Sequence, residues 1–198
     1  MFKEKDSPEK DCNHIKDLNE KPVKIPKRII LFLFIIVSVM LFDQATKAIA
    51  VSWVEENLPA YNPESILSII IVKNTGAAFG IFRDIPFVRN IFILLSLAAL
   101  SAVFFFRKSV FKGPFYFLLG ISLFAGGTLG NMFDRISRGY VIDFIDVDIP
   151  DININVFKIS LERWPAFNVA DSCICIGTFL ILVYLWKYEA KEPSLKGR

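Results

Sequence analysis

The sequence has very little histidine and cysteine. Its single histidine, His14, lies in a polar N-terminal tail, and its three cysteines are Cys12, Cys173 and Cys175. This scarcity excludes a histidine-based catalytic triad, a histidine-ligated zinc site and a histidine general base in the apolar part of the chain. Three cysteines cannot form a disulfide framework. We interpret Cys173 and Cys175 as buried apolar residues, and we expect neither a metal nor another cofactor.

Long apolar runs dominate the composition instead. Of the 198 residues, 54% are hydrophobic and 20 are phenylalanine, and the mean hydropathy is +0.46. Such a chain is too apolar for a typical soluble domain. Four stretches each approach the roughly 20 residues that cross a bilayer as a helix: 29–46, 86–106, 113–132 and 166–186. These stretches predict an all-α membrane bundle of four transmembrane helices.

The positions of lysine and arginine predict the orientation of the bundle. Eight basic residues precede the first apolar stretch, and the link at 107–112 contains three basic residues and no acid. The segments 50–90 and 134–165 are net acidic, with three basic against four acidic and four basic against six acidic residues. Because cytoplasmic loops are enriched in lysine and arginine, both termini are expected to be cytoplasmic.

Three regions follow from this topology. Residues 1–28 form a charged cytoplasmic extension without the features of a cleavable signal peptide. Residues 29–186 form the membrane domain, with outer loops at 50–85 and 134–165. Residues 187–198 form a cytoplasmic C-terminal tail.

The outer loops contain strand patterns. Residues 65–72 are rich in β-branched side chains, and residues 140–149 and 152–159 alternate apolar and polar side chains. The latter two predict a hairpin that turns near Pro150 and Asp151. We therefore expect a small β-sheet region at the outer membrane surface.

Polar residues that are far apart in the sequence reach the same outer level of this topology. They are Asp43 and Lys47 on the first helix, Asn74 after the first strand, Asn131, Asp134 and Arg135 on the third helix, Asp143 just beyond it, and Asn168 and Asp171 on the fourth helix. Gly76, in the same motif as Asn74, would let the backbone fold close to another segment. Carboxylates at membrane depth are costly and are functional candidates by default. The convergence indicates a polar site at the outer rim.

Most of these clusters also have a structural explanation. Asp43 and Lys47 are spaced to form an ion pair on one helix face. Other roles without chemistry are pairing of Asp134 with Arg135, capping of a turn by Asn74 and capping of the fourth helix by Asn168. Asp171 fits a capping role poorly, because it lies about five residues, or roughly 8 Å, inside the predicted helix.

Two neighbouring carboxylates suit peptide hydrolysis. Because both cannot easily ionise, the pair Asp143 and Asp171 would hold one proton near neutral pH. The pair would then supply a general base for water and a general acid for the scissile carbonyl, without a metal or a covalent intermediate. Surrounding asparagine and arginine donors would bind the substrate backbone and the developing oxyanion.

The same residues carry a family resemblance. The chain resembles the bacterial lipoprotein signal peptidases (signal peptidase II), an aspartyl membrane protease family. Five ordered motifs carry the resemblance: Phe-Asp-Gln-Ala-Thr-Lys (42–47), Asn-Thr-Gly-Ala-Ala-Phe-Gly (74–80), Gly-Gly-Thr-Leu-Gly-Asn-Met-Phe-Asp-Arg (126–135), Gly-Tyr-Val-Ile-Asp-Phe (139–144) and Phe-Asn-Val-Ala-Asp-Ser (167–172). It covers roughly residues 29–186, whereas the N-terminal extension and the acid-rich segment between Asp143 and Phe167 look longer than the family pattern.

The resemblance implies the roles of individual residues. Asp143 and Asp171 would be the catalytic pair that removes the signal peptide from diacylglyceryl-modified prolipoproteins, cleaving before the lipidated cysteine. The substrate-binding residues would be Asn74, Asn131, Arg135 and Asn168. Structural support would come from Asp43, Lys47, Gly76 and Asp134.

The resemblance also implies partners and a location. The expected partners are prolipoproteins, membrane lipids and inhibitors of the globomycin type, and no nucleic acid. The protein would lie in the bacterial cytoplasmic (inner) membrane, with its active site at the outer leaflet. We expect a monomer because the site can be built from one chain.

Three other readings compete with this one. Carboxylates in a membrane also serve proton-coupled transporters, although the inner half of this bundle lacks the charges of a through-path and no internal repeat is evident. A serine–lysine peptidase would use Lys47 and Ser172. A purely structural assembly protein would leave the outer asparagines and aspartates unexplained.

Overall fold

The computed structural model describes residues 26–56, 65–76, 87–154 and 159–189, with only the backbone described at 150–154 and 159–162. Most of the predicted N-terminal extension and C-terminal tail therefore lies outside the described residues, as do Cys12, His14 and residues 77–80 of the second motif.

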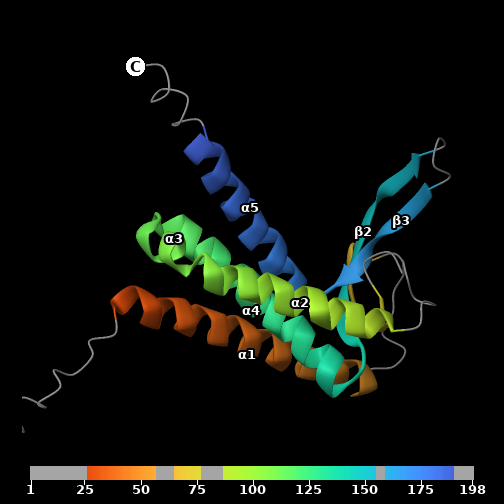
Figure 1. Ribbon diagram of the computed structural model, residues 1–198. Coiled ribbons are helices and arrows are strands. Elements are labelled where there is room, and N and C mark those ends of the chain that lie inside the picture. The colour runs from red at the N-terminus through yellow and green to blue at the C-terminus, as the bar shows by residue number, and fades with distance from the viewer. Residues whose placement is uncertain (1–25, 57–64, 77–86, 155–158, 190–198) are drawn as a thin grey trace, which may run out of the picture.

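Among the described residues, four helices are long and apolar enough to cross a membrane, as the sequence predicted (Figure 1). They are α1 (Lys27–Glu56), α2 (Val88–Phe105), α4 (Phe115–Ser137) and α5 (Val169–Glu189). Helix α1 continues ten residues past its predicted end at residue 46. The predicted link between the second and third spans contains a further short helix, α3 (Arg107–Lys112).

Helix α4 is the centre of the bundle and packs against α1, α2 and α5. Small residues allow the close approach of α4 and α5. A Cβ atom at Gly127 would lie 2.4 Å from the carbonyl oxygen of Ala170, and one at Gly177 would lie 2.6 Å from that of Gly120. Membrane helices commonly pack through such small residues, because backbone contact replaces the hydrophobic driving force that lipid cannot supply.

The distribution of side chains is the reverse of that in a soluble protein. Large apolar side chains on the outer faces are exposed, among them Phe34, Leu41, Leu94 and Phe179. Buried positions of α4 include small and polar residues such as Ser122 and Thr128. The chain is therefore a multi-pass membrane protein.

A three-stranded antiparallel sheet lies beside one end of the bundle (Figure 1). It consists of β1 (Leu67–Asn74), β2 (Val141–Ile154) and β3 (Ile159–Phe167), in the order β1-β2-β3. The predicted hairpin is present, but the predicted turn near Pro150 and Asp151 is wrong because β2 continues to Ile154. A register shift between Asp148 and Ile152 accommodates the proline within the strand, as bulges commonly do.

The junction between β3 and α5 differs from the sequence prediction. The apolar residues 166–167 belong to the end of β3, and α5 begins at Val169 instead of residue 166. Asp171 consequently lies in the first turn of α5. The expectation that both membrane cysteines are buried is also wrong, because Cys173 is half-buried and Cys175 is exposed.

Candidate active site

A cavity of about 440 Å³ lies where the bundle meets the sheet. Six of the predicted site residues line it: Asn74, Gly76, Asn131, Arg135, Asp143 and Asp171. The sequence prediction that these separate segments meet at one level is confirmed. Apolar residues from α2, including Phe92 and Leu95, complete the wall.

Asp143 is buried on β2, with 3% of its surface exposed. The amide nitrogen of Asn74 donates to its Oδ2 at 2.9 Å, and that of Asn168 donates to its Oδ1 at 2.8 Å. Burial raises the pKa of Asp143 to about 6, against the lowering effect of the Asn74 hydrogen bond, and the negative charge of Asp171 raises it further. Asp143 thus retains its proton to a higher pH than an ordinary aspartate.

Asp171 and Asn168 form a reciprocal capping box at the start of α5. The Oδ1 atom of Asn168 accepts the backbone N–H of Asp171 at 2.9 Å, and the Oδ2 atom of Asp171 accepts the backbone N–H of Asn168 at 3.1 Å. This arrangement satisfies N–H groups at the helix start. The prediction that Asn168 caps the fourth helix is confirmed, and the expectation that Asp171 lies too deep to cap is wrong.

The capping role leaves the other carboxylate oxygen of Asp171 for the site. Its Oδ1 atom accepts a hydrogen bond from the side-chain amide of Asn131 at 2.7 Å, and Asp171 lines the cavity. Asn168 contacts both aspartates, with its side-chain amide on Asp143 and its backbone N–H on Asp171. One fully buried asparagine therefore fixes the two carboxylates in a common frame.

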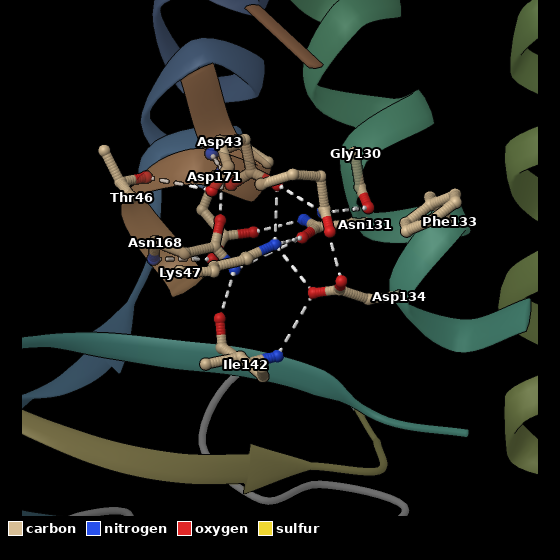
Figure 2. A network of polar contacts seen from close by, with 12 residues as sticks. Asp43, Thr46, Lys47, Gly130, Asn131, Phe133, Asp134, Ile142, Asn168 and Asp171 are labelled. Atoms are coloured by element: carbon tan, nitrogen blue, oxygen red, sulfur yellow. Dashed lines mark hydrogen bonds and ion pairs between the residues drawn. The ribbon is translucent and has the colours of Figure 1, made fainter. Parts of the chain in front are cut away.

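A buried charge cluster, formed by Asp43, Lys47 and Asp134, contacts the cavity residue Asn131 through Lys47 (Figure 2). The Lys47 ammonium lies 2.8 Å from Asp43 Oδ2 and 2.8 Å from Asp134 Oδ2, and all three side chains are fully buried. Arg138 pairs with the other oxygen of Asp134, so two formal positive charges balance two formal negative charges. The predicted Asp43–Lys47 pair is confirmed, whereas Asp134 pairs with Lys47 and Arg138 in place of Arg135.

This charge cluster accepts a backbone hydrogen bond from the residue that precedes each cavity aspartate. Asp43 Oδ1 accepts the backbone N–H of Ala170 at 2.9 Å, and Asp134 Oδ2 accepts the backbone N–H of Ile142 at 3.3 Å. Helix α1 and helix α4 thereby hold the backbone on which Asp171 and Asp143 are placed.

Lys47 also determines how the amide of Asn131 is oriented. Both the Lys47 ammonium and the Asn168 amide nitrogen donate to Asn131 Oδ1, each at 3.2 Å. Because its oxygen is directed at these two donors, the nitrogen of Asn131 faces Asp171 (Figure 2).

Arg135 is held at the edge of the cavity by three contacts. Its guanidinium donates to the carbonyl oxygens of Gly76 at 3.4 Å and Asn131 at 3.5 Å, and lies 4.8 Å from the centre of the Phe92 ring. The backbone N–H of Gly76 donates to Asn74 Oδ1 at 3.0 Å. The predicted turn-capping role of Asn74 is therefore confirmed alongside its contact with Asp143.

Sequence reasoning missed several members of the site. The amide nitrogen of Gln44 donates to Asp43 and Asp134, and Arg138 donates to the oxygen of Gln44 at 2.9 Å. The place of Gln44 within the first motif and the i,i+4 spacing of Arg138 from Asp134 were available signals. The cavity residues of α2 gave none, because its sequence reads as a plain apolar span.

The contacts also bear on the alternative chemistries. The Ser172 hydroxyl donates to the carbonyl oxygen of Asn168 at 3.2 Å, whereas the Lys47 ammonium is engaged by Asp43, Asp134 and Asn131. These contacts give Ser172 a helix-start role and do not make a serine–lysine pair. Within the described ranges, no group of three His, Cys, Asp or Glu side chains is placed to hold a metal ion.

Comparison with known proteins identifies similar sequences over most of the chain. The family described as Signal peptidase (SPase) II matches residues 35–187. A lipoprotein signal peptidase of Halothermothrix orenii is 34% identical, over 78% of this chain and 94% of that protein. A lipoprotein signal peptidase of Chlorobaculum tepidum is also 34% identical, over 83% of this chain and 99% of that protein.

Solved structures show the same similarity in three dimensions. One bacterial membrane enzyme is 32% identical with a TM-score of 0.59, over 79% of this chain and 88% of that chain. A second is 31% identical with a TM-score of 0.57, over 78% of this chain and 92% of that chain.

Proposed function

Because this chain belongs to the signal peptidase II family, and is therefore a peptidase, we propose that it removes signal peptides from prolipoproteins with Asp143 and Asp171 as its catalytic pair. The observation that carries the proposal is the placement of both carboxylates on the wall of one cavity. Asn168 holds them in a common frame, and the buried charge cluster supports the backbone beside each.

The two carboxylates divide the work of peptide hydrolysis. The ionised member takes a proton from water while the water oxygen attacks the scissile carbonyl carbon, and the protonated member donates to the carbonyl oxygen. Collapse of the tetrahedral intermediate breaks the C–N bond, and the leaving amine takes a proton from the pair. The pair titrates as one unit, and the pKa of Asp143, raised to about 6, lets the pair keep its shared proton to a higher pH than an ordinary aspartate would.

The surrounding amides and Arg135 serve substrate binding. Asn74, Asn131 and Asn168 restrain the carboxylates through side-chain hydrogen bonds. Arg135 is half-buried on the cavity wall, where its remaining N–H donors face a substrate backbone or a developing oxyanion. Asp43, Lys47, Gly76 and Asp134 act as structural support.

The substrate class follows from the family and from the composition of the cavity. We propose diacylglyceryl-modified prolipoproteins, cleaved immediately before the lipidated cysteine. The apolar wall contributed by α2 and by Ile174 of α5 suits lipid chains next to a scissile bond. Inhibitors of the globomycin type are expected to compete for the same cavity.

The distribution of basic residues supports an orientation. We place the protein as a monomer in the bacterial cytoplasmic (inner) membrane, with both termini cytoplasmic and the cavity at the outer leaflet. Residues 29–186 form the peptidase domain, and residues 1–28 and 187–198 are cytoplasmic extensions.

Cleavage of a purified diacylglyceryl-modified prolipoprotein tests the proposal. Asp143→Asn and Asp171→Asn should each reduce kcat at least about a hundredfold, because each removes one proton-transfer group. Asp148→Asn is the matched control, since it makes the same change on the same strand at an exposed position. Near-normal cleavage by either cavity variant, with the control also active, would remove that aspartate from catalysis.

A further inference from the structure

The end of the bundle away from the sheet carries a group of cations on α3 (Figure 1). They are Arg107, Lys108 and Lys112, and within the part of the chain that the structure describes none of the three forms an ion pair. The guanidinium of Arg28 donates to the carbonyl oxygen of Gly113 at 2.7 Å, which brings a further positive charge from α1 to this end. The positive charge gathered on these four side chains attracts anions.

A groove of about 620 Å³ lies between α3, α4 and α5 at this end. Its polar side chains are Lys112 and Ser109 of α3 and Tyr184 and Tyr188 of α5. Apolar side chains, including Ile121 and Ile181, line the remainder. Ile121 lies about two helical turns along α4 from the α3–α4 junction, so the groove extends from a cationic end toward the middle of the membrane.

Aromatic rings give this groove a firm wall. The rings of Phe117 and Tyr184 stack with their centres 3.8 Å apart and their planes 17° apart. Phe106 and Tyr188, which also line the groove, are exposed, as is typical of aromatic side chains at a membrane–water interface. Phosphate-sized anions would therefore meet Lys112 at headgroup depth, and acyl chains would meet an apolar wall below it.

We propose that this groove is a binding site for an anionic phospholipid, with the headgroup phosphate at Lys112 and an acyl chain along the α4–α5 wall. Basic pockets between membrane helices commonly bind such headgroups. A zwitterionic lipid offers the same chains but no net charge to match the cations of α3. The site is separate from the aspartate cavity, which lies at the sheet end of the bundle.

The three cations of α3 make a matched set of variants. Lys112 lines the proposed site, and Arg107 lines a smaller, almost wholly apolar groove of about 370 Å³. Arg107 is also engaged with Phe104, at 2.9 Å from its carbonyl oxygen and 4.3 Å from its ring centre. Lys108 lines neither groove, so Lys108→Gln removes the same charge from the same helix without touching the site.

Native mass spectrometry of the full chain in detergent, with phosphatidylglycerol and phosphatidylcholine as probes, tests the proposal. Phosphatidylglycerol should bind more tightly than phosphatidylcholine. Lys112→Gln should weaken phosphatidylglycerol binding about fivefold, the effect of one cation near a lipid headgroup, and Lys108→Gln should leave it nearly unchanged. Ile181→Trp should also weaken binding, because it fills the groove without changing the charge.

Three outcomes would overturn the site. Equal losses in Lys112→Gln and Lys108→Gln would indicate diffuse attraction to the α3 end. Equal binding of the two lipids would show that the headgroup charge is not recognised. Unchanged binding in Ile181→Trp would place the lipid elsewhere. Because binding is measured on the resting protein, none of these results depends on peptidase activity.

Discussion

Replacing Lys47 with methionine would expose how much the buried charge cluster contributes to the fold. The substitution keeps an unbranched side chain of similar length and removes the ammonium group. In the structure this ammonium lies 2.8 Å from both Asp43 and Asp134, and all three side chains are fully buried. Asp134 retains Arg138 as an ionic partner, whereas Asp43 has its ion pair with Lys47 alone among the described residues.

The expected loss is large for one side chain. Breaking a buried ion pair by removing one partner destabilises a protein by about 3–5 kcal/mol, because the remaining charge is left uncompensated. Lys47→Met should therefore lower the free energy of unfolding by an amount in that range. The Oδ1 atom of Asn131 would also lose one of the two hydrogen-bond donors that orient its amide, so peptidase activity should fall even in molecules that remain folded.

A double variant separates the charge effect from lost packing. If the uncompensated carboxylate of Asp43 causes the loss, adding Asp43→Asn to Lys47→Met should restore about 1–3 kcal/mol, as coupled neighbouring residues do. Unfolding by sodium dodecyl sulfate in mixed micelles, followed by tryptophan fluorescence, measures both variants. A single variant that loses under about 1 kcal/mol, or a double variant no more stable than the single one, would refute the reasoning.

Three further predictions address the cavity and the helix packing. The value of kcat/KM should fall as pH rises through about 6, where Asp143 releases its proton. Infrared titration should find a lower pKa for Asp143 in the Asp171→Asn variant, because the neighbouring negative charge is gone. Asn168→Ser and Asn168→Ala both remove the side-chain amide that donates to Asp143, so both variants should lose activity. The serine variant keeps a helix-capping oxygen and the alanine variant does not, so only the alanine variant should lose a further ~1 kcal/mol of stability in thermal unfolding. Gly127→Ala should destabilise the α4–α5 contact by about 1–3 kcal/mol, measured in the same way, because its Cβ would lie 2.4 Å from the carbonyl oxygen of Ala170.

The membrane helices and the meeting of the polar clusters were predictable from sequence. Helix length and hydropathy are local properties. Four crossings bring the ends of the first and third spans and the starts of the second and fourth spans to the same side of the membrane. Asp43 with Lys47 was predictable for the same reason, since an i,i+4 pair on one helix needs no knowledge of the rest of the fold. The partners of Asp134 were not, because the contact with Lys47 joins α1 to α4.

The start of α5 shows two sequence signals in conflict. The apolar run begins at residue 166, whereas a cap at Asn168 requires the helix to begin at Val169. The cap was the correct signal, because residues 166–167 belong to the end of β3, where Phe167 pairs with Ile145. Similarly, Pro150 predicted a turn because proline has no backbone N–H to donate to a neighbouring strand. The irregular register of the β2–β3 pairing at this point means that no such hydrogen bond is needed.

The arrangement of the charge cluster has a consequence for biogenesis. Asp43 and Lys47 lie on α1, which precedes the other three spans in the sequence, and Asp134 follows more than eighty residues later. A charged residue in an inserting helix costs up to about 2.5–3.5 kcal/mol on insertion scales, the value at the helix centre, and pairing on one helix face lowers that cost before the three later spans are present. We expect α1 to enter the bilayer as a self-neutralised segment, with the second carboxylate joining Lys47 only when α4 docks. The ion pair that later supports the cavity would then also act as the insertion aid of the nascent chain.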